Sequence, residues 1–256
     1  MSTTNYVAFR TIVVKEVRRY MRIWLQTVLP PMVTTALYFI IFGQLIGRQL
    51  GSIAGYTYMD YIVPGLILMA VITNSYANVV SSFYGAKFSH YVEELLIAPI
   101  PNTLILIGFV TGGVARGLTV GMAVTVVASF FTPLHLHNLP VVAGVVILTS
   151  VLFALGGFIN AVYAKSFDDI SIVPTFVLTP LTYLGGIFYS IDMLPGIWRD
   201  ISLFNPILYM INAFRYGLLG VSDIGVGTAF GVILLFIAVL FAYALFLLHR
   251  GVGLKN

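Results

Sequence analysis

The stretch TAFGVILLFIAVLFAYALFLL, residues 228–248, decides the fold class. It carries no charged residue, and as an α-helix it would extend about 31 Å, close to the thickness of the hydrocarbon core of a bilayer. The rest of the chain is similar, since 59% of its 256 residues are hydrophobic and only 9% are charged. An ordinary soluble domain has about 25% charged residues. We therefore expect an all-α integral membrane protein.

Long apolar runs with at most one charged residue each predict five further spans. Each run is bounded by charged residues or by turn signals, such as the segment TPLHLHN at residues 132–138. The six transmembrane helices are expected at residues 23–47, 58–83, 103–131, 139–163, 170–190 and 228–249.

The distribution of lysine and arginine predicts the orientation of these spans. An even number of spans places both termini on one side of the membrane. Nine Lys or Arg residues lie in the termini and the even-numbered loops, against three, Arg48, Arg199 and Arg215, in the odd-numbered loops. Cytoplasmic loops carry the excess of positive charge, so both termini are expected in the cytoplasm. The net charge of +4 is concentrated near the N-terminus, which favours a membrane surface over a nucleic acid as the partner.

Residues 1–22 have the pattern of an amphipathic helix. Apolar residues recur at helical spacing on one face: Tyr6, Phe9, Val13, Val17, Tyr20 and Trp24. Cations occupy the other face: Lys15, Arg18, Arg19 and Arg22. This pattern predicts a helix in the membrane interface, with its cations toward anionic headgroups. It fits a simple topology anchor and also a helix that contacts a cytoplasmic partner.

A short cytoplasmic helix is expected at residues 89–98, between the second and third spans. Ser89 is the predicted N-cap, and Glu93 and Glu94 lie in the first turn, where the helix dipole favours anions. Pro99 disfavours a helical conformation for the residue before it and so ends the helix. Taken alone, the segment fits an ordinary capped loop helix.

The segment between the fifth and sixth spans predicts a re-entrant hairpin. Its longest charge-free piece, Ile201–Phe214, has 14 residues, too few to cross a core of about 30 Å. Asn205-Pro206 interrupts this piece. We expect two short helices that enter the outer leaflet, turn back, and lie over the outer end of a pathway. The hairpin would act as an outer gate, or as a passive lid anchored by aromatic residues: Trp198, Tyr209 and Tyr216.

Three motifs give the chain a resemblance to ABC-2 type exporter permeases, closest to the YadH-like bacterial subgroup. EELLIAP at 93–99 resembles the coupling segment of that family. PLTYLGGIFYS at 180–190 looks like its fifth-span exit, and FNPILY at 204–209 with FRYG at 214–217 is similar to its outer hairpin. The resemblance implies one transmembrane domain over 1–256, divided into an interfacial helix (1–22), spans 1–5 with the coupling helix 89–98 (23–190), the outer hairpin (191–227), and span 6 with a cytoplasmic tail (228–256).

The resemblance also implies partners and roles. The chain would be half of a homodimer in the bacterial inner membrane, and a separate ABC ATPase would bind ATP and magnesium. Lipids, lipid-linked glycans, drugs and small hydrophobic metabolites all fit as substrates. ATPase coupling is expected from Arg18, Arg19, Ser89, Tyr91, Glu93, Glu94, Leu95, Leu96, Pro99, Asp168 and Asp169. Pathway or gate positions are expected at Asn74, Asn78, Arg116, Phe188, Tyr189, Asn205, Pro206, Tyr209 and Arg215.

Arg116 stands out because it lies about fourteen residues into the third span, where an arginine is costly. Asp60, Asn74 and Asn78 of the second span are its candidate partners, and a structural role and a pathway role fit equally well. Small residues on the third and fourth spans predict close helix packing: Gly112, Gly113, Gly117, Gly121, Gly156 and Gly157.

Several classes of chemistry are excluded or disfavoured by missing motifs. The sequence has no G-x-x-x-x-G-K-[ST] phosphate loop, so ATP hydrolysis is expected in another chain, and no catalytic residue is expected here. With zero cysteines, the pair His135 and His137 makes an incomplete metal site, so no metal or cofactor is expected. The alternative is an ion-coupled secondary transporter, which would need a carboxylate near the membrane midplane.

Overall fold

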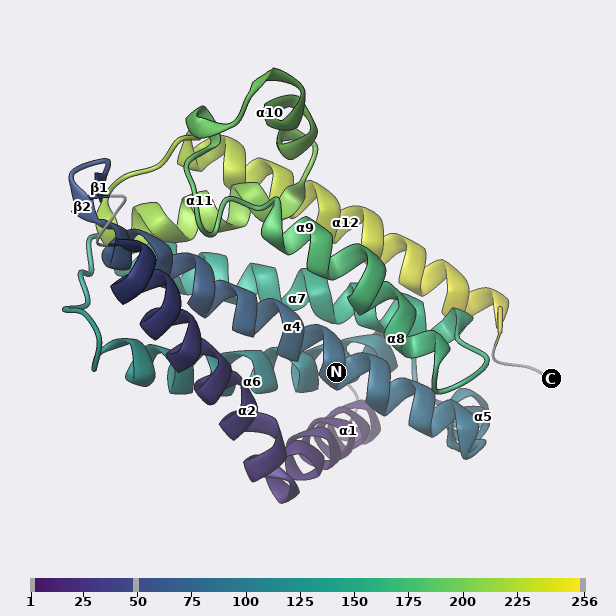
Figure 1. Ribbon diagram of the computed structural model, residues 1–256. Helices are drawn as coiled ribbons and strands as arrows, with labels where there is room; N and C mark the ends of the chain where they lie inside the picture. Colours follow the sequence, from purple (N-terminus) through teal and green to yellow (C-terminus); the bar gives the residue numbers. More distant parts are fainter. Residues whose placement is uncertain (1–2, 48–50, 254–256) are drawn as a thin grey trace.

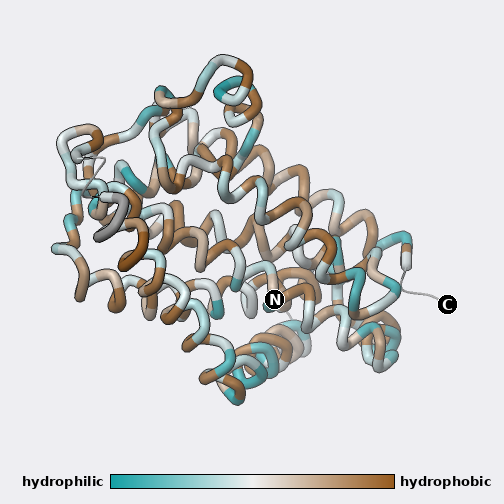
Figure 2. The backbone as a smooth tube through the Cα atoms, viewed as in Figure 1, coloured by the Kyte–Doolittle hydropathy of each residue, from teal (hydrophilic) through white to brown (hydrophobic). Residues whose placement is uncertain are grey.

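The computed structural model describes residues 3–47 and 51–253, and it is a bundle of long helices (Figure 1). Among the described residues, five helical segments are long and apolar enough to cross a membrane. Hydrophobic residues dominate their length, as Figure 2 shows. The five are α2 (Trp24–Tyr38) with the start of the π-helical segment η1 (Phe39–Ile46), α4 (Tyr58–Phe88), α6 (Asn102–Ala128), α7 (Leu139–Tyr163) and α12 (Val226–Arg250).

Helix α4 is the centre of the bundle, with α6 and α7 packed closely against it. A Cβ atom added to Gly117 of α6 would lie 2.0 Å from the Ser75 Oγ of α4. One added to Gly157 of α7 would lie 2.5 Å from the Tyr76 carbonyl oxygen of α4. The predicted small-residue packing is therefore confirmed, because only glycine permits these approaches.

The N-terminal helix α1 (Thr3–Arg22) forms as predicted but presents an unexpected inner face. It lies against α6 and α4, and a Cβ on Gly108 would be 2.6 Å from Ile12 while one on Gly112 would be 2.5 Å from Glu16. Of the predicted apolar face, Tyr20 is 4% exposed and packs against α6, whereas Tyr6 and, at the start of α2, Trp24 are 57% and 55% exposed and so available to lipid. Two glycines on α6 decide which face of α1 packs.

Helix α5 (Tyr91–Ile97) follows α4 at the end of the bundle where α12 also ends (Figure 1). The predicted N-cap is wrong. Ser89 caps the C-terminus of α4, and its hydroxyl donates to the Ala86 carbonyl. His90, in the left-handed region at φ 59°, turns the chain into α5. The proline stop is confirmed, because Ala98 before Pro99 is extended.

The predicted fifth span is shorter than expected. It consists of α8 (Asp169–Val173), the π-helical segment η2 (Pro174–Leu178) and α9 (Thr179–Tyr183). These fifteen residues extend only about 22 Å. Pro174 and Pro180 lack the N–H groups of a regular ladder, which accounts for the irregular middle. A sixth full span is therefore not confirmed by the structure.

Two short helices follow, as the hairpin prediction required. The 3-10 turn η3 (Ile191–Met193) leads to α10 (Gly196–Leu203), and α11 (Pro206–Leu219) returns. Asn205 separates them, since its side-chain oxygen accepts from the Ile207 N–H and its amide donates to Leu181. Helix α11 is largely buried against α4, α7 and α12, whereas α10 is exposed.

A small β-ribbon, which was not predicted, lies at the end of the bundle opposite α5 (Figure 1). Strands β1 (Ser52–Ile53) and β2 (Tyr56–Thr57) pair in antiparallel register, with Ser52 opposite Thr57. The Tyr56 hydroxyl donates to the Leu219 carbonyl at 2.5 Å. The ribbon thus ties the start of α4 to the end of α11.

Candidate functional site

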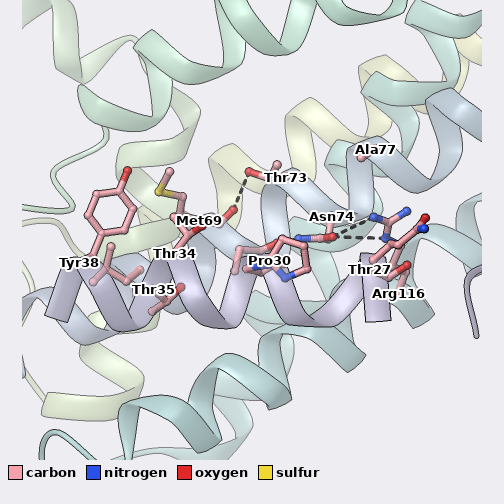
Figure 3. Close-up of a pocket in the computed structure, with 14 residues that line it drawn as sticks. Thr27, Pro30, Thr34, Thr35, Tyr38, Met69, Thr73, Asn74, Ala77 and Arg116 are labelled. Atoms are coloured by element: carbon pink, nitrogen blue, oxygen red, sulfur yellow. Dashed lines mark hydrogen bonds between the residues drawn. The ribbon is translucent and has the colours of Figure 1, made fainter. Parts of the chain in front are cut away.

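A cleft of about 350 Å³ opens between α2 and α4 (Figure 3). Helix α6 contributes one side chain to it, that of Arg116. Arg116 and Asn74 lie at one end of the cleft and Tyr38 at the other (Figure 3). Its lining is Gln26, Thr27, Pro30, Pro31, Thr34, Thr35, Tyr38, Leu66, Met69, Ala70, Thr73, Asn74, Ala77 and Arg116.

Arg116 and Asn74 form the polar end of the cleft. The Arg116 Nε and Nη2 atoms donate to the Asn74 side-chain oxygen at 3.3 and 3.1 Å. The Asn74 amide nitrogen donates to the Ala70 carbonyl at 3.0 Å, which fixes the direction of its oxygen. An arginine near the centre of a membrane helix costs about 2.5–3.5 kcal/mol on insertion scales. One neutral amide offsets part of that cost and leaves the charge itself uncompensated.

The other predicted partners of Arg116 lie elsewhere. Asp60 is at the far end of α4, where it accepts hydrogen bonds from Thr57 and Thr132. Asn78 instead accepts hydrogen bonds from the Arg19 guanidinium. The prediction is therefore confirmed for Asn74 and wrong for Asp60 and Asn78.

The wall formed by α2 carries two successive prolines. Pro30 and Pro31 have no N–H, so the carbonyls of Gln26 and Thr27 lack their regular helical donors. All four of these residues line the cleft. The polar end therefore combines a cation on α6 with two backbone carbonyls on α2 that the prolines leave without their regular helical donors.

An aromatic cluster closes the opposite end of the cleft. Tyr38 shares a hydrogen bond of 3.2 Å with the Tyr183 hydroxyl. Phe42 stacks on Phe188 with ring centroids 4.7 Å apart, and Tyr38 contacts both rings. Phe188, a predicted pathway residue, thus lies where the segment after α9 meets the first span.

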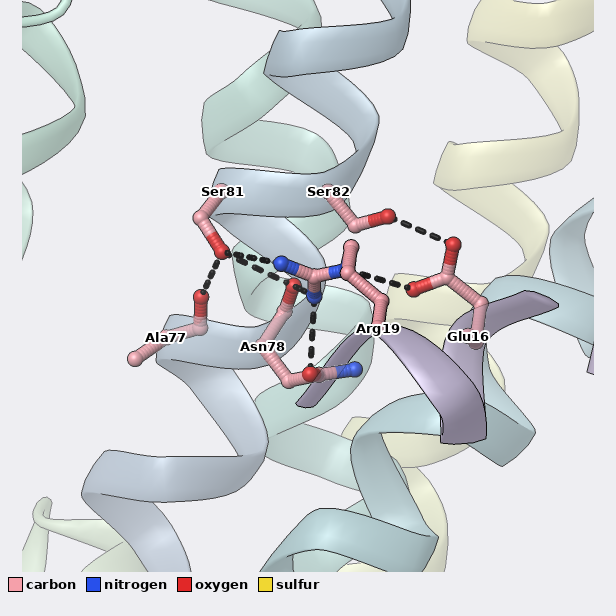
Figure 4. A network of polar contacts seen from close by, with 6 residues as sticks. All are labelled: Glu16, Arg19, Ala77, Asn78, Ser81 and Ser82. Atoms are coloured by element: carbon pink, nitrogen blue, oxygen red, sulfur yellow. Dashed lines mark hydrogen bonds and ion pairs between the residues drawn. The ribbon is translucent and has the colours of Figure 1, made fainter. Parts of the chain in front are cut away.

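A polar clamp, made of Glu16, Arg19, Asn78, Ser81 and Ser82, joins α1 to α4 (Figure 4). Glu16 is fully buried and accepts from the Ser82 hydroxyl at 2.6 Å. Arg19 Nη2 donates at 2.8 Å to both oxygens of Asn78, its Nη1 donates to Ser81, and its Nε lies 3.5 Å from Glu16.

The clamp corrects one prediction and adds a residue that sequence reasoning missed. Arg19 does not lie on the outward cationic face, because it points at α4. Glu16 was not singled out. The signal was available, since Ile12, Glu16 and Tyr20 recur every four residues and form the buried stripe of α1.

One face of helix α5 packs against the bundle, and its opposite face is exposed. Val92 and Leu95 are buried, whereas Glu93 and Glu94 are exposed and Ile97 is 85% exposed. The side chains of α5 therefore present two carboxylates and one large apolar group to the surroundings.

Two further contacts shape this end of the bundle. The Lys15 ammonium lies 4.0 Å from the centroid of the Tyr91 ring, which links α1 to α5. Asp169 accepts the backbone N–H groups of Lys165 and Ser166, and the Lys165 bond, with that to the Ser166 side chain, lowers the pKa of Asp169. The adjacent Asp168 is exposed.

Arg215 is placed away from the cleft. It is 1% exposed, donates to the Gly186 carbonyl at 2.6 Å and lies 3.9 Å from the centre of the Tyr61 ring. It therefore connects α11, α4 and the turn after α9.

The remaining predicted gate residues shape the hairpin. Asn205 and Pro206 begin α11, and the Tyr209 hydroxyl donates to the Leu203 carbonyl. Tyr189 is partly buried near the same hairpin. The structure does not bring these side chains into the cleft. Among the described residues, no group of three His, Cys, Asp or Glu side chains could hold a metal ion.

Known proteins show similarity over most of the chain. A model of the ABC-2 type transporter family matches residues 7–219. The inner membrane transport permease YadH of Escherichia coli K12 is 55% identical over 251 residues, which cover 98% of each chain. Nodulation protein J of Rhizobium leguminosarum bv. viciae is 25% identical over 231 residues, 88% of each chain. Nodulation protein J of Rhizobium meliloti is 23% identical over 251 residues, 96% of this chain and 90% of the relative.

Proposed function

The chain belongs to the ABC-2 type transporter family, and we propose that it is the membrane permease subunit of an ATP-driven exporter. It contributes the translocation pathway, and a separate ABC ATPase binds and hydrolyses ATP. The proposed location is the bacterial inner membrane, which agrees with the name of its 55% identical relative. The positive-inside distribution of Lys and Arg supports a cytoplasmic location for the termini and α5.

The observation that carries this proposal is the outward face of α5. Buried Val92 and Leu95 fix the helix to the bundle, whereas Glu93, Glu94 and Ile97 are exposed, with Glu93 paired to the neighbouring His90. A rigid helix of this kind between two long spans offers a cytoplasmic subunit a contact through which motion passes to α4 and α6. The ATPase surface that receives it is expected to combine cationic and apolar side chains.

Reversing the charge of this face tests the proposal. Glu93→Arg with Glu94→Arg should abolish co-purification of the ATPase with the tagged chain and remove ATP-dependent transport, without reducing membrane insertion. Asp200→Arg is the matched control, because it reverses an exposed carboxylate on α10. Full recovery of the ATPase with the double variant would remove α5 from the interface.

A sixth span completes the proposed topology. The segment α8–η2–α9 would cross the membrane together with the turn that follows, although its helical part is short. Two copies of the chain would then enclose the pathway as a homodimer, with the cleft between α2 and α4 facing it. The exposed apolar side chains of α2 are available to lipid or to the second copy: Trp24, Leu25, Leu29, Val33, Leu37, Ile40 and Ile41.

The hairpin of α10 and α11 is the proposed outer gate. Phe204 at its turn is 87% exposed, which suits a contact between two copies. Phe204→Cys introduces a single cysteine into a chain that has none. The two copies should crosslink at rest, and export should slow until reductant is added. Efficient crosslinking with unchanged export would show that the hairpin is a passive lid.

An ion-coupled transporter is the second candidate, and the buried Glu16 is the observation that favours it. In such proteins, carboxylates inside the membrane mark ion or proton pathways. However, Glu16 already has Ser82 and Arg19 as partners. Uptake into proteoliposomes that persists without ATP and follows an ion gradient would support this alternative.

A further inference from the structure

The cleft between α2 and α4 holds an uncompensated positive charge. Among the described residues there are three ion pairs, Arg19–Glu16, His90–Glu93 and Arg199–Asp192. None of these pairs includes Arg116. Arg116 is half-buried, and a cation that is partly shielded from water attracts an anion more strongly than a fully hydrated one, so this end of the cleft is suited to a negatively charged group.

The hydrogen-bonding capacity of Arg116 is also only partly used. A guanidinium has five N–H donors, and the structure shows two of them bonded to Asn74. The other three find no acceptor in the described part of the chain. Because Asn74 is itself fixed by the Ala70 carbonyl, it holds the guanidinium in one orientation. A phosphate or carboxylate would match the free donors, since planar guanidinium groups bind such anions through paired hydrogen bonds.

The polarity of the cleft changes along its length. From the Arg116 end, hydroxyl groups of Thr34, Thr35 and Thr73 accompany an apolar wall of Leu66 and Met69. Tyr38 forms the far end (Figure 3), where it contacts Tyr183 and Phe188 of the aromatic cluster. A volume of about 350 Å³ exceeds the need of a bare phosphate and lies in the range of sites for small organic ligands.

We propose that this cleft binds an amphiphile whose headgroup has a net negative charge, carried by a phosphate or a carboxylate. The anion contacts Arg116, and the aliphatic part lies along Leu66 and Met69 toward Tyr38. The anionic amphiphile is thus the substrate class of the permease, a statement that rests on the proposed function. Asn74 is a positioning residue, because it acts through the orientation of the guanidinium.

The binding test uses the full chain, purified in a neutral detergent without any ATPase. Four probes are compared by equilibrium binding: dodecyl phosphate, dodecylphosphocholine, dodecanol and inorganic phosphate. Dodecyl phosphate should bind at least tenfold more tightly than each of the other three. Arg116→Gln should lose that preference, Arg116→Lys should keep part of it, and Asn74→Ala should weaken it.

Two further variants guard against trivial explanations. Arg10→Gln removes an exposed cation of α1 and should leave binding unchanged, which excludes a general effect of net charge. Thr73→Phe fills the cleft from an exposed position and should reduce the binding of dodecyl phosphate by at least tenfold while Arg116 is retained. This second variant keeps the proposal testable if Arg116→Gln fails to fold.

Three results would overturn the proposal. Equal affinity for dodecyl phosphate and dodecanol would show that the charge is not recognised. Inorganic phosphate binding as tightly as dodecyl phosphate would show an anion site that ignores the alkyl chain. Unchanged binding in Thr73→Phe would place the ligand outside the cleft. None of these measurements involves the ATPase, so each would leave the α5 co-purification result, and with it the permease assignment, intact.

Discussion

Replacing Arg19 with methionine should release α1 from the bundle. The substitution keeps a long apolar stem but removes every hydrogen bond that the guanidinium makes to Asn78 and Ser81. It also leaves the carboxylate of Glu16, which is fully buried, with Ser82 as its one remaining partner among the described residues.

The size of the effect follows from these contacts. A hydrogen bond to a charged group contributes about 1.5–3 kcal/mol. The bonds of Arg19 share one guanidinium, whose side chain is 29% exposed, so their contributions do not add in full. We expect a loss of about 3 kcal/mol in the free energy of docking α1, which is roughly a 100-fold change in the docking equilibrium.

Hydrogen exchange of the backbone amides measures this equilibrium directly. In lipid nanodiscs, the amides of α1 should exchange roughly 100-fold faster in Arg19→Met than in the unmodified chain. An amide whose protection factor in the unmodified chain is below about 100 will lose only that smaller amount. The amides of α6 and α7 should keep their protection. Arg18→Met is the matched control, since Arg18 is exposed on the same helix. Unchanged exchange in Arg19→Met, or equal acceleration in the two variants, would refute the clamp.

Three further predictions concern topology, packing and pH. Ser89→Cys should react with a membrane-impermeant thiol reagent only from the cytoplasmic side and Ser52→Cys only from outside; the reverse pattern would invert the topology. Gly157→Ala should destabilise the bundle by about 1–3 kcal/mol, because the added Cβ would lie 2.5 Å from a backbone oxygen of α4. Gly156→Ala is the control and should not destabilise it, because its nearest contact would be 3.8 Å. Equal melting temperatures for the two variants would contradict this prediction. The pKa of Asp169 is lowered in the folded chain by the Lys165 backbone N–H and the Ser166 hydroxyl, so the hydrogen bonds from the backbone N–H groups of Lys165 and Ser166 to this carboxylate should persist at neutral pH and be lost as the pH falls through that lowered value. Protection factors of these two amides, corrected for the intrinsic pH dependence of exchange, that do not fall on acidification would disprove this coupling.

Local sequence signals predicted most of the helices correctly. The span expected at 139–163 is observed as Leu139–Tyr163, because Asn138 and Pro140 mark its start and hydrophobic length marks the rest. The end of α5 at Pro99 and the break at Asn205-Pro206 follow from the conformational limits of proline and of the residue before it. These features depend on neighbours along the chain, so the sequence contains the information for them.

Contacts between distant segments were predicted less well. Hydropathy indicated that residues 170–190 cross the membrane, yet prolines interrupt that helix and a turn follows it at Gly186. Arg116 could be identified as unusual from its position, but the sequence did not distinguish among its three candidate partners on α4, Asp60, Asn74 and Asn78. Only the packing of α4 against α6 selected Asn74.

The sequence by itself determined that the chain is a membrane protein, where its long helices run and where the short ones stop. Only the tertiary structure decided which faces meet: that α1 buries Ile12 and Glu16 against two glycines of α6, and that Arg19 points inward. The physical reason lies in the solvent. Lipid tails are as apolar as the protein interior, so hydrophobicity does not distinguish a lipid-facing side chain from a packed one. That distinction comes from close glycine contacts and polar pairs between helices, which exist only once the chain has folded.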